Sequence, residues 1–190
     1  KNQRFNQFGL TGCLTILNSS IEESNLKINN TRCEDGLNII SSSGNIHSIN
    51  INNSKFDGLD IDASKIHLKD VNISNSGNDC LDVSYGEYKI DSAKMHLCGD
   101  KAISIGESSR FYSKELIIDE AKIGISSKDY SISEIFNASI DKVDLCFESR
   151  QKKQEFGGSR ISFDSLVGCE GRYFIGRNSI ATINEKTLIE

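Results

Sequence analysis

The chain has 190 residues, and its 22 basic and 27 acidic side chains give a formal net charge of −5 at pH 7. This excess of acid argues against a general nucleic-acid-binding surface, which favours basic patches. No run of residues approaches the ~20 apolar residues of a membrane span, so we predict no membrane insertion. The length fits one domain, and the absence of Pro suits strands that form hydrogen bonds on both edges.

The first 33 residues only partly resemble the rest of the chain. Residues 9–20 alternate like a coil, but the segment up to residue 32 is out of register with the later repeats by about one residue. Neither an amphipathic capping helix nor an initiator Met stands at Lys1. Because an uncovered solenoid end invites association, we expect these residues to be a piece of a longer or processed polypeptide whose other part caps this end.

Residues 34–149 repeat with a period of 22 residues. A first apolar column contains Leu37, Leu59, Leu81, Ile103, Ile125 and Phe147. Three further apolar columns contain Ile39, Ile61, Val83 and Ile105; Ile46, Leu68, Ile90 and Tyr112; and Ile51, Ile73, Met95 and Ile117. A small residue always precedes the first column, namely Gly36, Gly58, Cys80, Ala102, Gly124 and Cys146.

Within each repeat apolar and polar residues alternate, as at 59–62, which is typical of strands with one buried face. Clusters of Ser, Asn and Gly such as 41–45 and 74–78 favour turns between them. Strands of successive coils that pair in parallel, about 4.7–4.9 Å apart, stack like residues. We therefore predict an all-β fold, a right-handed parallel β-helix (solenoid) with about 22-residue coils. The left-handed hexapeptide alternative requires coils of about 18 residues.

After residue 149 the regularity decays again. The charged stretch 150–155 should loop outward, with Lys152 and Lys153 in solvent, before a strand resumes at 161–163. Residues 179–183 have the pattern of a last rung. Residues 1–190 are thus predicted to form one β-helix domain of about eight coils, regular at about 34–149 and less regular at 1–33 and 150–190.

The six cysteines form no CxxC pair and show no metal-ligand spacing with the three histidines. We expect buried, unpaired thiols, the usual state of free Cys, although an even count allows disulfides in a secreted protein. Cys80 and Cys146 are 146 − 80 = 66 residues apart, which is three coils. At about 4.8 Å a coil the two lie roughly 14 Å apart, whereas bonded cysteines have Cα atoms within ~7 Å. We predict that this pair is not bonded.

The same arithmetic predicts an acidic outward face. One column contains Asn38, Asp60, Asp82, Ser104, Ser126 and Glu148. At the preceding turn stack Asp35, Asp57, Asp79 and Lys101. Neighbouring carboxylates can raise a pKa, bind sugar hydroxyls or hold a cation, so Asp60 and Asp82 are candidate calcium ligands and no other cofactor is predicted. The structural alternative is that these Asp side chains bond backbone amides at turns, with Lys101 neutralising Asp79.

Segments 57–61 (DGLDI), 77–83 (GNDCLDV) and 98–106 (CGDKAISIG) resemble successive rungs of the polygalacturonase-type enzymes of the pectin-lyase-like superfamily. The family motifs read NTDGIDI, GDDCIAI and GHGISIG, followed by RIK. In that family three aspartates from neighbouring coils protonate the glycosidic oxygen and activate water, with inversion. The resemblance covers about 75 residues and implies a β-helix fold.

Carried over residue by residue, this resemblance makes Asp57 and Asp79 the catalytic candidates. Lys101 stands at the family's histidine, and Lys128 could match only the last residue of RIK. Asn78 replaces the first member of the Asp pair, the expected acid, and an amide cannot donate a proton as a carboxylic acid does. The ligand-binding candidates are Asp57, Asp60, Asp79, Asp82, Lys101 and Lys128.

Segments 99–107, 123–129 and 152–157 are also similar to β-helix segments of bacterial surface proteins, some of which are joined to spore-coat-kinase-like domains. This resemblance implies an accessory or glycan-associated module, extracellular or attached to the cell surface, with a cytoplasmic capsule-biosynthesis setting left open. The expected partners are a polysaccharide or other domains of the same chain.

Three functional hypotheses follow. The first is a non-catalytic β-helix module of a larger bacterial surface or capsule-related protein that presents its acidic face to a glycan or a partner domain. The second is a polysaccharide hydrolase or lyase acting through stacked aspartates, and the third is a purely structural spacer. Four tyrosines could stack on sugars, but partly buried rung residues are the simpler interpretation, and Tyr112 is expected in the core. These are Tyr85, Tyr88, Tyr112 and Tyr130.

Overall fold

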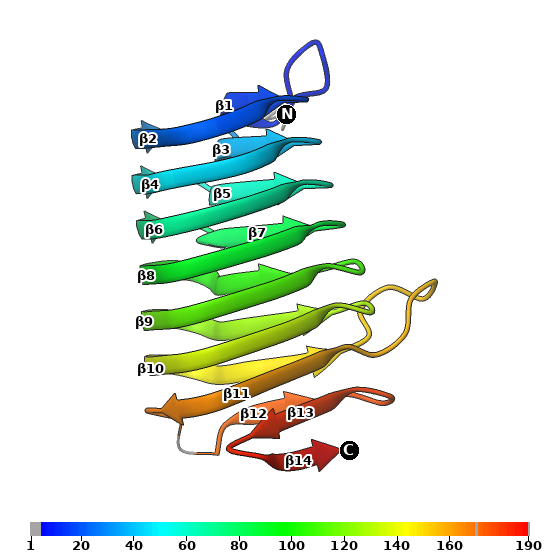
Figure 1. Cartoon of the computed structure of the whole chain (residues 1–190). Coiled ribbons are helices and arrows are strands. Elements are labelled where there is room, and N and C mark those ends of the chain that lie inside the picture. Colours follow the sequence, from blue (N-terminus) through cyan, green and yellow to red (C-terminus); the bar gives the residue numbers. More distant parts are fainter. Residues whose placement is uncertain (1–4, 170, 190) are drawn as a thin grey trace.

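The computed structural model describes residues 5–169 and 171–189, and this part of the chain contains strands but no helix. The strands wind into a right-handed solenoid whose coils stack from the N-terminal to the C-terminal end (Figure 1). The stack has about eight turns. The predicted parallel β-helix is confirmed. Lys1, where a capping helix was considered, lies outside the described residues.

The two faces of the solenoid differ in strand length. The short-strand face is built from β1 (Gly12–Leu17), β3 (Asp35–Ile40), β5 (Asp57–Asp62), β7 (Leu81–Ser84) and β12 (Tyr173–Ile175). The long-strand face is built from β2 (Ser20–Thr31), β4 (Ser43–Ser54), β6 (Lys65–Ser76), β11 (Arg160–Val167), β13 (Ile180–Ile183) and β14 (Lys186–Ile189). Three 19-residue strands bend round a corner and belong to both faces: β8 (Glu87–Ile105), β9 (Arg110–Lys128) and β10 (Ile132–Arg150).

Strand pairing reproduces the sequence period. Leu37 pairs with Leu59, and Leu59 with Leu81, at an offset of 22 residues. Leu26 pairs with Ile49 at an offset of 49 − 26 = 23, so the predicted slip of about one residue in the segment up to residue 32 is confirmed. All six residues of the first apolar column are fully buried. A Cβ at Gly58 would lie 2.7 Å from the Cys80 carbonyl oxygen, which explains why glycine stands at this position of the small-residue column.

Two predicted core positions are wrong. Tyr112 and Ile117 are each 38% exposed. In their places Ser113 pairs with Ile90 and Ile118 pairs with Met95, and both of these β9 residues are buried. The third and fourth apolar columns therefore do not continue with the 22-residue spacing into β9.

The cause is one extra residue in the turn between β8 and β9. Val83 pairs with Ile105 at an offset of 22, but Glu87 pairs with Arg110 at an offset of 23. A one-residue slip turns every side chain of a strand to the opposite face. The slip is undone at the next corner, where a register shift follows Cys98, so the short-strand face keeps its 22-residue columns.

The expectation of unpaired thiols is wrong, because all six cysteines form disulfides. The bonds are Cys13–Cys33, Cys80–Cys98 and Cys146–Cys169. In each pair the first cysteine occupies the small-residue column and the second lies about one coil later, at the same corner, with Cα atoms 5.3–5.7 Å apart. The prediction that Cys80 is not bonded to Cys146 is confirmed.

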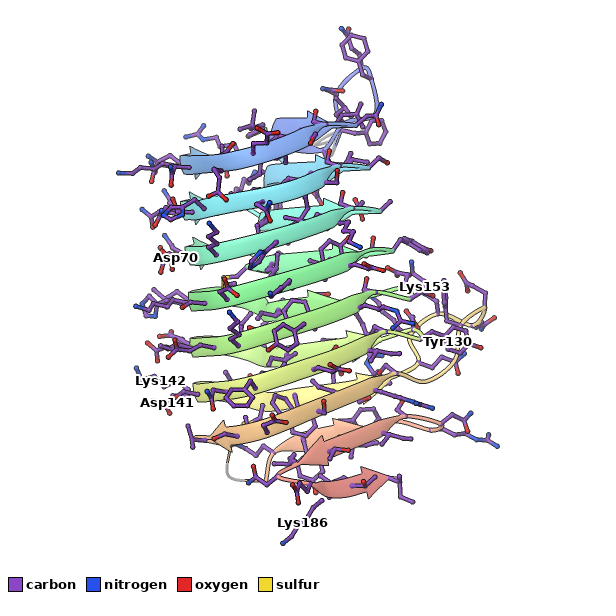
Figure 2. The ribbon with its side chains drawn as sticks, viewed as in Figure 1. Asp70, Tyr130, Asp141, Lys142, Lys153 and Lys186 are labelled. Atoms are coloured by element: carbon purple, nitrogen blue, oxygen red, sulfur yellow. A yellow bond between two sulfur atoms is a disulfide. The ribbon has the colours of Figure 1, made fainter. Side chains whose placement is uncertain are left out.

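The two ends of the solenoid differ. β13 forms the predicted last rung on β11, and β14 then folds back antiparallel on β13 as a hairpin. The charged stretch after β10 loops outward as predicted, and its backbone is anchored where Asp129 Oδ1 accepts the N–H groups of Lys152 and Lys153 at 2.6 and 2.9 Å. Figure 2 shows Lys153 and Tyr130 at the edge where this loop projects, and Asp141 and Lys142 at the opposite edge.

Candidate functional site on the short-strand face

Strand pairing brings the predicted acidic column together. Asn38 pairs with Asp60, Asp60 with Asp82, and Asp82 with Ser104, so these side chains lie above one another on the short-strand face. Asp60 and Asp82 are half-buried, whereas Asn38 and Ser104 are fully buried. The Asn38 Nδ2 donates to Asp60 Oδ2 at 3.1 Å. The side chains of the polar column therefore pack against one another and are not fully exposed to solvent.

The carboxylates at the turn join successive coils. Asp57 Oδ1 accepts hydrogen bonds from Asn78 Nδ2 at 2.6 Å and from the Asp79 backbone N–H at 2.8 Å. Asp79 Oδ1 accepts the Lys101 backbone N–H at 2.9 Å and lies 3.4 Å from Lys101 Nζ. Lys101 Nζ also contacts Asp100. These contacts match the structural role predicted as the alternative for this column.

Burial shifts the acid strength of these carboxyls strongly. Loss of solvation raises the pKa of Asp57 to about 7 and that of Asp60 to about 9, with neighbouring carboxylates adding to the effect. Burial also raises the pKa of Asp82 to about 6, although the Lys128 charge opposes the shift. The pKa of Asp79 is raised by burial against the opposing effect of Lys101. Near neutral pH this face therefore carries both protonated and ionised carboxyl groups.

Cationic groups follow the carboxylates along the same face. Lys128 is 5% exposed, and its Nζ donates to Ser104 Oγ at 2.7 Å. Burial lowers the pKa of Lys128, although Asp82 opposes the shift. Burial also lowers the pKa of Lys101, but its contacts with Asp100 and Asp79 outweigh this and leave it raised. The face thus changes from acidic near β5 and β7 to mixed in charge near β9.

Some members of this face were not singled out by the sequence. Asp62 pairs with Ser84, whose hydroxyl contacts its carboxylate, and both lie beside the acidic column. Arg150 is a further such member, and its Nε lies 2.9 Å from Oε2 of Glu148, the last residue of the predicted column. Continuing the 22-residue spacing from residue 40 through 62 and 84 would have identified the second outward column.

The arrangement bears on the predicted metal and tyrosine roles. Within residues 5–169 and 171–189, no group of three or more His, Cys, Asp or Glu side chains is arranged to hold a metal ion. Tyr88 is buried and its hydroxyl oxygen lies 2.9 and 2.6 Å from the Ile61 and Ser84 carbonyl oxygens, either of which can accept its one hydrogen, so it is a rung residue. Tyr85 and Tyr130 are exposed and pack on Phe156 of the projecting loop.

Comparison of the chain with protein-family models, curated proteins and solved structures finds no significant match. Membership of the pectin-lyase-like superfamily therefore gains no support from these comparisons. What the structure establishes is the parallel β-helix itself. In the described part of the chain, no helix is long and apolar enough to cross a membrane.

Proposed function

We propose that this chain is a non-catalytic β-helix module of a larger, extracellular bacterial surface protein, and that it binds a glycan through the short-strand face. The observation that carries the proposal is the pair of half-buried carboxyl groups of Asp60 and Asp82, which lie next to each other in a polar row on this face. A carboxyl that is protonated part of the time both donates and accepts hydrogen bonds, as sugar hydroxyls do. A rigid row of such groups suits a hydroxyl-rich polymer.

Two contacts favour binding over hydrolysis. Asp57 and Asp79 each use one oxygen to accept a backbone N–H from the next coil, which is a structural role. Asn78, at the position of the family's acid, donates its amide hydrogen to Asp57. A carboxamide in that position supplies no proton to a leaving group.

The three disulfides favour an extracellular location, because such bonds persist in oxidising compartments and are rare in the cytosol. The similarity of segments 99–107, 123–129 and 152–157 to bacterial surface β-helices supports the same setting. A stapled solenoid holds its face rigid, so little conformational entropy is lost when an extended ligand binds.

Calorimetric titration with neutral and acidic polysaccharides, with and without calcium, tests the proposal. We expect binding without turnover, and a loss of about tenfold or more in affinity for the Asp60→Asn, Asp82→Asn double variant. The control is Asp141→Asn, an exposed carboxyl at the edge away from the projecting loop (Figure 2), and this variant should bind as the unchanged chain does. Absence of binding to every polysaccharide would refute the proposal and favour a structural spacer.

A polysaccharide hydrolase or lyase is the second candidate. It is favoured by the raised pKa of Asp57, about 7, because a general acid must hold its proton near neutral pH. The rung motifs that resemble polygalacturonase-type enzymes point the same way. Release of new reducing ends or unsaturated products, abolished by Asp79→Ala, would establish this candidate and overturn the non-catalytic one.

A further inference from the structure

A second, separate surface lies on the long-strand face. An open groove of about 680 Å³ crosses the first residues of β4, β6, β8, β9 and β10. Because it is lined at equivalent positions of five successive coils, it runs along the solenoid axis for about 19 Å, four strand spacings. No residue of the acidic column on the short-strand face lines it.

Two outward columns form the walls of the groove. One wall contains Ser43, Lys65, Glu87, Arg110 and Ile132. The other contains Asn45, His67, Lys89, Tyr112 and Glu134. The floor between them is the strand backbone at Gly44, Ile66, Tyr88 and Phe111, and the last three side chains point into the buried core.

The walls carry cations that are available to a ligand. Within residues 5–169 and 171–189, Lys89 and Arg110 have no carboxylate at ion-pair distance, and both are exposed. Lys65 Nζ lies 2.8 Å from Glu87 Oε2, but this pair is also exposed and can be exchanged for a ligand at small cost. The three cations come from three successive coils and alternate between the walls.

The aromatic member of the groove is there because of the extra residue before β9. The one-residue slip turns Tyr112 outward beside Lys89, with which it pairs, and turns Phe111 inward to the core. A half-exposed ring between cations offers a flat apolar surface of the kind on which the face of a sugar ring packs. The departure from the 22-residue period thus builds part of the groove.

We propose that this groove binds an extended anionic polysaccharide, with Lys89 and Arg110 contacting its carboxylate or sulfate groups and Tyr112 packing on a sugar ring. A polymer lying along the axis meets an equivalent position in every coil, about 4.8 Å apart. An extended peptide is disfavoured, because β4, β6, β8 and β9 are paired on both edges and leave no backbone groups for strand addition.

The test is titration of the whole chain with oligomers of polygalacturonate and with dextran sulfate, against neutral dextran and poly-glutamate. We expect an anionic polysaccharide to bind, neutral dextran not to bind, and affinity to fall as salt is raised. The Lys89→Ala, Arg110→Ala double variant should lose about tenfold or more in affinity. Tyr112→Ala should weaken polysaccharide binding several-fold, and Glu134→Gln should strengthen it.

The matched control is the Lys27→Ala, Lys94→Ala double variant, which removes the same charge from exposed lysines outside the groove. Equal loss in both double variants would show non-specific attraction and overturn the proposal. Preference for poly-glutamate, or no binding to either anionic polysaccharide, would also overturn it. Loss confined to the Asp60→Asn, Asp82→Asn variant would refute the groove while leaving the proposed function of the short-strand face intact.

Discussion

On the two faces of this solenoid the pKa values of aspartate side chains are shifted in opposite directions. On the short-strand face burial raises the pKa of Asp60 to about 9. On the long-strand face the pKa values of Asp91 and Asp119 are lowered, because Lys114 and Lys142 lie 2.8 Å from their carboxylates. A carboxylate that shares solvent with a cation is stabilised as an ion, whereas one packed among other carboxylates is stabilised as an acid.

The difference has a structural origin. On the long-strand face Asp91 and Asp119 each lie between a His and a Lys of neighbouring coils. His67 Nε2 lies 3.0 Å from Asp91 Oδ2, and His96 Nδ1 lies 2.9 Å from Asp119 Oδ2. Opposite charges therefore alternate along that face. On the short-strand face the 22-residue period stacks Asp on Asp, and Lys128 lies beyond them. The pKa of a carboxyl in a column therefore depends on which residue the neighbouring coil places next to it, and not on the repeat alone.

The largest expected effect comes from removing the disulfide at the corner between the two faces. Replacing Cys80 and Cys98 by Ala removes a disulfide that joins residues 18 positions apart in the sequence. We expect a loss of about 2–4 kcal/mol in the free energy of unfolding, measured by denaturant titration with the other two disulfides intact. A loss below about 0.5 kcal/mol would show that strand pairing alone holds this corner.

The pH dependence of thermal stability tests the short-strand face as a whole. A group whose folded pKa lies above its unfolded value stabilises the fold below the unfolded pKa, and this contribution is lost as pH rises through the folded pKa. Asp82, Asp57 and Asp60 have folded pKa values of about 6, 7 and 9 against the usual 3.8. The melting temperature should therefore fall as pH rises from about 4 to 9. A melting temperature that rises over this range would contradict the burial of these acids.

A single substitution on each face sharpens the comparison. Asp60→Asn removes the carboxyl whose ionisation is most costly, so at pH 8 we expect a gain of about 1 kcal/mol in stability and a flatter pH profile. Asp119→Asn, on the long-strand face, removes contacts with Lys142 and His96 and should leave the slope between pH 8 and 9 unchanged. Calorimetric melting of both variants across that range provides the measurement. Equal slopes in both variants would remove the distinction between the faces.

The smallest effect is expected at the corner that both faces share. Leu97 is 38% exposed and has a φ of 55°, in the left-handed region, where Asn53 and Asn75 stand in the preceding coils. Asn tolerates this conformation better than Leu, so Leu97→Asn should stabilise the chain by about 0.5 kcal/mol. Denaturant midpoints of the variant and the parent decide the point, and a clear destabilisation would mean that Leu97 packing outweighs backbone strain.

The sequence predicted the coil, the first two apolar columns in full and the other two through residue 95, and the order of Asn38, Asp60 and Asp82, because all of these depend on a period that is visible in one dimension. It did not predict the one-residue slip of β9, because an insertion in the turn leaves the alternation of apolar and polar residues intact in the strands before and after it. The disulfides were missed although separations of 20, 18 and 23 residues are each close to one coil. The groove depends on which residues meet across five coils after the slip.

The extra residue between Ile105 and Arg110 shows how such a molecule can acquire new surfaces. Adding one amino acid at a bend, and removing one at the next, exchanges the interior and exterior residues of the strand between them. The strands of the neighbouring face keep their register. A lineage of these proteins could therefore diversify what it recognises through small insertions and deletions at its bends, without any point substitution in the hydrophobic interior.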